Sequence, residues 1–312
     1  MDNKNFINGT EGVFYDMPDA DYRKAPGVSN SMLKHIALEG EQPGSPAHFQ
    51  EALKTPTEDT DALFFGRMVH SRILTPECPL PAVEVIPPFY AAPADCSAVK
   101  QKKCAPGDML PWHGAAKFCK DWMADRQARG IRPVSQDQMD NMNGVVNAVV
   151  NHPTAAMAFS EGKPEVSLFR RHWIREDAAL LCKARLDWVP KAPALVDIKT
   201  TLDARKDAFS RDMLTRRYFV QAAYYLDIWN ALNPNDQKTN FIFIAVEKFP
   251  PYAISVFDVT PKALAVGRGE YRANLRLLQT CIELDSWPAY TPDLQSVDLP
   301  DWAYKKGLEV YA

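Results

Sequence analysis

The stretch that decides the fold is Arg185-Leu-Asp187-Trp-Val-Pro-Lys-Ala-Pro-Ala-Leu-Val-Asp197-Ile-Lys199-Thr-Thr201. Its two apolar runs, residues 180–189 and 194–200, predict two strands joined by the proline-bounded turn at 190–193. If that turn is centred on Ala192, residues whose numbers sum to 384 lie opposite each other. Asp187 then faces Asp197, and Lys199 lies two residues further along the same face because side chains alternate along a strand.

Two carboxylates that face each other at about 5 Å repel, so this pair needs a cation beside it. Lys199 is one candidate cation, and a divalent metal ion is the better one. Hard oxygen ligands favour Mg²⁺ or Mn²⁺ over Zn²⁺. The alternative is a solvated hairpin face on which acidic and basic side chains alternate. The apolar flanks Leu195, Val196 and Ile198 favour a core-facing strand, where a charge needs a partner.

The sequence on either side of this hairpin predicts a mixed architecture. Further strands are expected at 165–174, 240–247 and 252–259, and helices at 216–232 and 261–283. In the N-terminal half, helices are expected after Ser29, from Ser45, and at 62–74, 111–129 and 135–151. The first thirty residues and residues 76–110 lack periodicity and are expected to be irregular.

We therefore expect residues 1–312 to form one domain of the α+β (mixed α/β) class. Residues 1–160 form its mainly helical part, with the excursion at 76–110, and residues 161–283 form the catalytic sheet core. The tail at 284–312 is rich in aromatic residues and proline, and we expect it to pack across the surface or onto a neighbouring subunit.

Composition excludes several classes of protein. The chain has 36 Lys and Arg against 39 Asp and Glu, a balance that argues against a protein that only coats nucleic acid. No apolar run is long enough for a membrane helix, and the N-terminus lacks the pattern of a secretory signal, so we expect a cytoplasmic protein. None of the six cysteines forms a CxxC pair, which argues against a zinc ribbon or an iron–sulfur site and favours free thiols.

Asp187 followed by Asp197-Ile198-Lys199 resembles the catalytic signature of the PD-(D/E)xK nuclease superfamily. Three further motifs are similar to those of its RecB-like branch and occur in the same order: Gly66-Arg-Met-Val-His70, Glu165, and Gln221-Ala-Ala-Tyr-Tyr225. The opening segments Ser29-Asn-Ser-Met-Leu-Lys-His-Ile and Ser45-Pro-Ala-His-Phe most resemble the RecE-type, lambda-exonuclease-like enzymes of phages. The resemblance covers about residues 28–260 and implies a PD-(D/E)xK core, in which helices flank a central mixed sheet.

The resemblance also implies roles for these residues. Asp187, Asp197, the Ile198 carbonyl and His70 would bind Mg²⁺ or Mn²⁺. Lys199 would position or deprotonate the attacking water and stabilise charge on the phosphate. Glu165 would hold a second metal ion or orient water, and Gln221 and Tyr225, one helical turn apart, would support the site. Taken alone, His70 and the tyrosines would be ordinary core residues.

Similar enzymes hold the 5′-phosphate of DNA near an N-terminal helix. The matching positions are Ser29 and Ser31 at a helix start, with Arg23 and Lys24 just upstream. The alternative is that the serines only cap the helix and that the two basic residues are solvated.

The implied function is a metal-dependent 5′→3′ exonuclease that acts on double-stranded DNA ends. It would release 5′-mononucleotides and leave 3′ single-stranded tails for annealing recombination. A homo-oligomeric ring and a single-strand annealing partner follow from the same resemblance. The alternatives are a RecB-like nuclease of other polarity, an endonuclease, or a non-catalytic DNA-binding relic of the fold.

Overall fold

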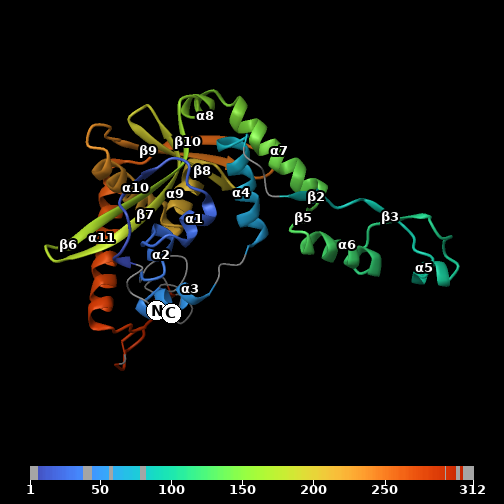
Figure 1. The fold of residues 1–312 in the computed structure, drawn as a ribbon, viewed down its shortest axis with the longest axis horizontal. Helices are drawn as coiled ribbons and strands as arrows, with labels where there is room; N and C mark the ends of the chain where they lie inside the picture. Colours follow the sequence, from blue (N-terminus) through green and yellow to red (C-terminus); the bar gives the residue numbers. More distant parts are fainter. Residues whose placement is uncertain are drawn as a thin grey trace.

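A six-stranded mixed sheet forms the centre of the computed structural model, which describes residues 6–37, 44–55, 59–77, 82–291, 293–299 and 303–304. The strand order is β1-β6-β7-β8-β9-β10 (Figure 1). Strands β8 and β9 are parallel, and the other neighbouring pairs are antiparallel. The strands are β1 Gly12–Phe14, β6 Gly162–Arg175, β7 Ala178–Pro190, β8 Ala194–Thr201, β9 Asn240–Glu247 and β10 Ile254–Asp258. The predicted α+β class is confirmed.

Helices cover both faces of the sheet because its central strands are apolar on each side. On β8, Val196 and Ile198 face one hydrophobic cluster, whereas Leu195 faces a second and larger one. The first face is covered by α4 Asp61–Leu74, α7 Gln136–Asn151 and α8 Pro153–Ala158. The second is covered by α2 Asn30–Leu33, α3 Pro46–Lys54, α9 Lys206–Thr215, α10 Tyr218–Leu232 and α11 Pro261–Leu284.

The lead-in segment was wrongly predicted to be irregular, because it contains β1 and the helix α1 Asp19–Lys24. Strand β1 pairs with β6 at the edge of the sheet. The buried Lys183 of β7 donates hydrogen bonds to the carbonyls of Tyr22, Arg23 and Ala25, the last at 2.6 Å. These bonds satisfy carbonyls at the end of α1, so a tertiary contact orders a segment that has no periodicity of its own.

Residues 82–134 form an arm that projects from the body between α4 and α7 (Figure 1). At its base, β2 Val83–Val85 pairs in parallel with β5 Arg132–Val134. Further out, β3 Phe89–Ala91 pairs with β4 Met109–Pro111 in an antiparallel ribbon beside α5 Ser97–Lys100 and α6 Lys117–Ala128. The prediction of an irregular 76–110 segment was therefore wrong at β2, β3, α5 and the start of β4, and the other described residues of the segment are irregular, as predicted.

The helix predicted at 111–129 begins only at Lys117, because Pro111 lies in β4 opposite Phe89. Pro is compatible with the edge of a two-stranded ribbon, where its missing N–H breaks no ladder.

The start of the C-terminal tail packs as predicted, across the surface of the same chain. The Trp287 ring stacks on Phe49 at a centroid distance of 6.2 Å, and the Ala47 N–H donates to the Pro288 carbonyl. Residues 292, 300–302 and 305–312 lie outside the described part of the chain. None of the described helices has the length and hydropathy of a membrane span.

Candidate active site

The two central strands meet in the register that the sequence predicts. Trp188 of β7 pairs with Val196 of β8, which places Asp187 opposite Asp197. The Ile198 N–H donates to Asp187 Oδ2 at 3.0 Å, so this carboxylate side chain satisfies a backbone donor of the neighbouring strand. The predicted carboxylate pair is therefore built into the strand junction itself.

Asp197 is the most deeply buried charged group of the site, with 1% of its surface exposed. Lys199 Nζ lies 2.6 Å from Asp197 Oδ1, and Gln221 Nε2 of α10 donates to Asp197 Oδ2 at 2.7 Å. A buried carboxylate needs such partners because its desolvation is otherwise unfavourable. Residues of two sequence motifs, Lys199 of the strand signature and Gln221 of the helix motif, thus meet at one carboxylate.

His70 approaches the same junction from α4, on the other side of the sheet. Its Nε2 lies 3.0 Å from the Ile198 carbonyl oxygen, and its Nδ1 lies 3.5 Å from Asp187 Oδ2. Burial lowers the pKa of His70, which favours the neutral ring. The two predicted metal ligands, His70 and the Ile198 carbonyl, therefore lie beside Asp187. In this structure the His70 ring and the Ile198 carbonyl contact each other.

Glu165 lies on β6, across from Asp187. The register pairs Pro164 with Trp188 and Val166 with Leu186, and Glu165 between them has a left-handed backbone with φ of 51°. Few non-glycine residues adopt that conformation without support from their surroundings.

The support comes from Arg185, a residue that the sequence analysis gave no role. Arg185 Nε donates to Glu165 Oε2 at 2.5 Å, and its Nη1 donates to the Met17 carbonyl and to Ser167 Oγ, each at 2.9 Å. One guanidinium thus joins the third carboxylate of the site to the lead-in segment. Its place two residues before Asp187 on the same strand face was the only signal available in the sequence.

Two aromatic rings near Lys199 were also missed. Lys199 Nζ lies 4.8 Å from the centroid of the Tyr218 ring and 5.7 Å from that of Phe243. Such cation–π contacts restrict a long side chain and favour its charged form. Tyr225, which the sequence did predict, is half-buried one turn after Gln221, and burial raises its pKa well above the ordinary value.

The titratable groups of the site influence one another. Burial and the neighbouring Asp197 raise the pKa of Asp187 well above its ordinary value. Burial alone would lower the pKa of Lys199, but the Asp197 and Asp187 carboxylates raise it. The site therefore holds more negative charge than its surroundings accommodate easily, which is the condition under which a cation binds.

Comparison with known proteins identifies the family. The model of the PDDEXK-like domain of unknown function (DUF3799) matches residues 29–300. The chain belongs to this family. Its membership confirms the PD-(D/E)xK superfamily that the signature at Asp187, Asp197 and Lys199 predicts. No curated protein sequence matches the chain.

One solved structure shares the fold of this chain, and a second is similar over a smaller part of it. A protein from Eubacterium rectale described as a candidate exonuclease matches with a TM-score of 0.55 and 14% identity, over 89% of this chain and 92% of that one. A phage-related exonuclease from Haemophilus somnus has a TM-score of 0.31 and 13% identity, over 55% of this chain and 86% of that one. At this identity, the first similarity shows that the two proteins share the PDDEXK-like fold.

The PDDEXK-like site has donors of the right kind for a hard divalent cation. Asp187, Asp197 and the Ile198 carbonyl offer oxygen atoms at the strand junction, and Asp197 Oδ1 is buried with no hydrogen bond other than its ion pair with Lys199. In the described part of the chain, no three His, Cys, Asp or Glu side chains are already arranged as a metal site. Lys199 and Gln221 contact the two carboxylate oxygens of Asp197 in this structure. The oxygen donors are of the type that Mg²⁺ and Mn²⁺ prefer, but they are not yet arranged around a metal position.

Of the predicted 5′-phosphate residues, Ser29 and Ser31 lie at the start of the region that the family model matches, and Arg23 and Lys24 lie just before it. Ser29 Oγ accepts the Met32 N–H as a helix cap and lies 2.8 Å from Ser31 Oγ. Arg23 is paired with Asp19 at 2.6 Å, and Lys24 is exposed at the end of α1. Arg23 and Lys24 lie in the last turn of α1, and Ser29 and Ser31 lie at the start of α2. Their role in binding phosphate stays a prediction.

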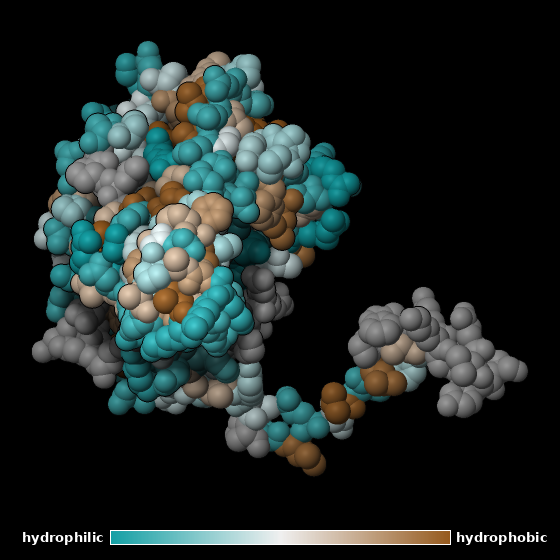
Figure 2. Space-filling view, turned by 90° about the vertical axis from the view of Figure 1, so that its right-hand side faces the viewer, coloured by the Kyte–Doolittle hydropathy of each residue, from teal (hydrophilic) through white to brown (hydrophobic). Residues whose placement is uncertain are grey.

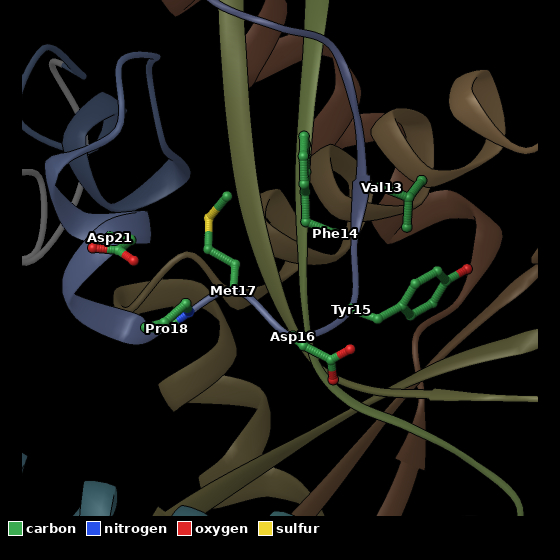
Figure 3. A pocket seen from close by; sticks show the side chains of 7 residues that line it. All are labelled: Val13, Phe14, Tyr15, Asp16, Met17, Pro18 and Asp21. Carbon is green, nitrogen blue, oxygen red and sulfur yellow. The ribbon is translucent and has the colours of Figure 1, made fainter.

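A cavity of about 500 Å³ borders the lead-in segment. It is lined by Val13, Phe14, Tyr15, Asp16, Met17, Pro18 and Asp21 (Figure 3). Its link to the site is the Met17 carbonyl, which accepts a hydrogen bond from Arg185. The carboxylates of Asp187, Asp197 and Glu165 do not line this cavity.

Proposed function

We propose that this protein is a metal-dependent 5′→3′ exonuclease that acts on double-stranded DNA ends. It releases 5′-mononucleotides and leaves 3′ single-stranded tails for annealing recombination. The observation that carries the proposal is the meeting of Asp187, Asp197 and Lys199 at one strand junction of a PDDEXK-like fold.

The chemistry divides among the chain's own residues. Asp187, Asp197 and the Ile198 carbonyl would hold Mg²⁺ or Mn²⁺, which polarises the phosphate and activates water when it is bound. Lys199, held between Asp197 and the Tyr218 ring, orients that water and offsets the charge that develops on the phosphate. Gln221 keeps Asp197 in place, and Tyr225 stands beside Gln221 on the same helix.

Glu165 and His70 complete the proposed centre. Arg185 fixes one oxygen of the Glu165 carboxylate, which leaves the other to orient water or to bind a second metal ion. His70 supports the Ile198 carbonyl from the opposite face.

The finer parts of the proposal come from the RecE-type resemblance. They are the 5′→3′ polarity, the 5′-phosphate contacts of Ser29, Ser31, Arg23 and Lys24, a homo-oligomeric ring and an annealing partner. The proposal also includes a cytoplasmic location. The description of the Eubacterium rectale protein as a candidate exonuclease supports an exonuclease over an endonuclease.

The test uses linear duplex DNA labelled at one 5′ end, with or without a 5′-phosphate, in magnesium or in EDTA. We expect labelled mononucleotide to appear only with magnesium, and faster from the phosphorylated end. Release from a 3′ label first would contradict the polarity. Cleavage of a closed circle would indicate an endonuclease, and no cleavage with any divalent metal would contradict the enzyme assignment.

A further inference from the structure

The arm is fixed to the helix that carries His70. Val83 and Val85 at its base pack with Phe64 and Met68 of α4 in one hydrophobic cluster. Arg132 of β5 donates to Asp59 and Asp61 at the start of α4, at 2.7 and 2.6 Å, and lies over the Phe64 ring at 4.3 Å. The base of the arm thus has a defined position relative to the candidate active site.

The outer part of the arm is also a folded unit. The Tyr90 and Phe118 rings stack at 5.3 Å, and Trp112 meets Trp122 edge-on at the same centroid distance. Arg126 lies over the Trp122 ring at 4.4 Å. These contacts join the β3–β4 ribbon to α6, so the side chains outside them are displayed on a defined scaffold.

Arginines and lysines of the arm differ in how they are used. Arg126, Arg129 and Arg132 all form ion pairs with acidic side chains. Five lysines lie further out, and all are exposed and form no ion pair with any residue that the structure describes: Lys100, Lys102, Lys103, Lys117 and Lys120. The arm has eight Lys and Arg against five Asp and Glu, whereas the whole chain has 36 against 39. Residues 87–125 of the arm have five lysines against four aspartates, so what distinguishes the lysines is their exposure without an ion pair to any described residue and not a large excess of charge. Figure 2 looks onto this end of the arm and shows both hydrophilic and apolar residues on it.

We propose that the arm is a second DNA-binding element, in which these five lysines contact the phosphate backbone of the duplex behind the reacting end. The proposal rests on the proposed function for the identity of its ligand. Lysine ammonium groups on flexible stems suit contacts to successive phosphates without reading base sequence. The arm follows α4 in the chain and projects from the body (Figure 1), and α4 also carries His70, which contacts the Ile198 carbonyl at the strand junction.

A DNA duplex matches this surface better than an acidic protein does. Duplex DNA presents one charge per about 1.7 Å over its whole length, so it can engage lysines on α5, on the following turn and on α6 together. An acidic protein would have to match the spacing of these separate elements.

The experiment compares Lys100→Gln/Lys102→Gln/Lys103→Gln with a control in which three exposed body lysines are changed, Lys163→Gln/Lys191→Gln/Lys262→Gln. Duplex affinity is measured in EDTA from 50 to 200 mM salt, so hydrolysis does not enter. The affinity falls as salt rises, and each lost phosphate contact reduces the magnitude of the slope of log K against log salt by about 0.9. We therefore expect the magnitude of the slope to be smaller by about 2 to 3 in the arm variant and unchanged in the control. With magnesium, the arm variant should have a higher KM and an unchanged kcat.

Either of two results overturns the proposal: an unchanged salt slope in the arm variant, or the same decrease in the control. Thermal unfolding of both variants checks that neither set of exposed substitutions alters folding. If the wild type cleaves no DNA but its duplex binding depends on the arm lysines, the proposed function fails and the arm proposal stands. If it cleaves DNA and the arm variant binds as the wild type does, only the arm proposal fails.

Discussion

The candidate active site and the arm use charged residues in opposite ways. At the site, charges are buried and paired, with Asp197 1% exposed and held by both Lys199 and Gln221. On the outer arm, lysines are exposed and unpaired among the described residues, and only Ala92 and Cys119 are buried between residues 87 and 131. The contrast teaches that reaction chemistry needs groups fixed in a desolvated place, whereas contact with a long polyanion needs charge that remains available at the surface. Substitutions in the two regions should therefore separate turnover from binding.

The largest separation is expected for Lys199→Ala. Loss of the ammonium beside Asp197 should reduce kcat by about 10³-fold or more, since it removes the group that we propose to act on the developing charge. Duplex affinity in EDTA should stay close to that of the wild type. Initial rates and filter binding measure the two quantities, with the exposed Lys163→Ala as the control. A loss of binding equal to the loss of rate would contradict the separation.

A smaller effect is expected for Gln221→Ala. The substitution removes the amide that donates to Asp197 Oδ2, and supporting residues of this kind typically contribute 10- to 100-fold to activity or metal affinity. We expect a decrease in kcat within that range, measured at saturating DNA, and no change for the exposed Gln127→Ala. A variant as active as the wild type would show that Lys199 alone keeps Asp197 in place.

Arg185→Gln tests the support of Glu165. The variant leaves a half-buried carboxylate and the Met17 carbonyl without their donor, so the free energy of unfolding should fall by about 2 kcal/mol. In a Glu165→Gln background the same change should cost clearly less, because the pair is already broken. Chemical denaturation in EDTA measures all four proteins, and additive effects would contradict the coupling.

The most subtle prediction concerns Lys183, which holds the end of α1 against β7. Burial lowers the pKa of Lys183 from 10.5 to about 8, so between these values the unfolded chain binds a proton that the folded chain has released. The stability of the wild type should therefore rise with pH from about 8 to 10 relative to that of Lys183→Met. Parallel pH profiles for the two proteins would show that Lys183 keeps its ordinary pKa when folded.

Local signals in the sequence predicted much of the fold. The position of the turn between Pro190 and Pro193 predicted the strand register in which Trp188 pairs with Val196, and the structure confirms it. Strand β9 has the predicted bounds 240–247. Ser29, Ser45 and Ser135 cap helices where their side chains predicted helix starts. The register of the two strands predicted that Asp187, Asp197 and Lys199 lie together. The convergence of His70, Glu165, Gln221 and Tyr225 on them was predicted from the resemblance to the nuclease superfamily.

The features that the sequence did not reveal depend on contacts between distant segments. The three-residue strands of the arm are too short to show periodicity, and β1 is ordered by pairing with β6. Helix α9 was missed because no Ser, Thr, Asp or Asn side chain caps its start, where Arg205 is the N-cap residue. Arg185 and Tyr218 acquire their importance from Glu165 and Lys199, which lie 20 and 19 positions away in the chain.

The most direct test of the central claim is a calorimetric titration of the metal-free protein with Mn²⁺. The account predicts saturable binding in the wild type and in the exposed control Asp177→Asn, and a decrease in affinity of about 100-fold or complete loss in Asp197→Asn. No binding in the wild type, or equal binding in Asp197→Asn, would contradict the assignment of this strand junction as a metal-dependent catalytic centre.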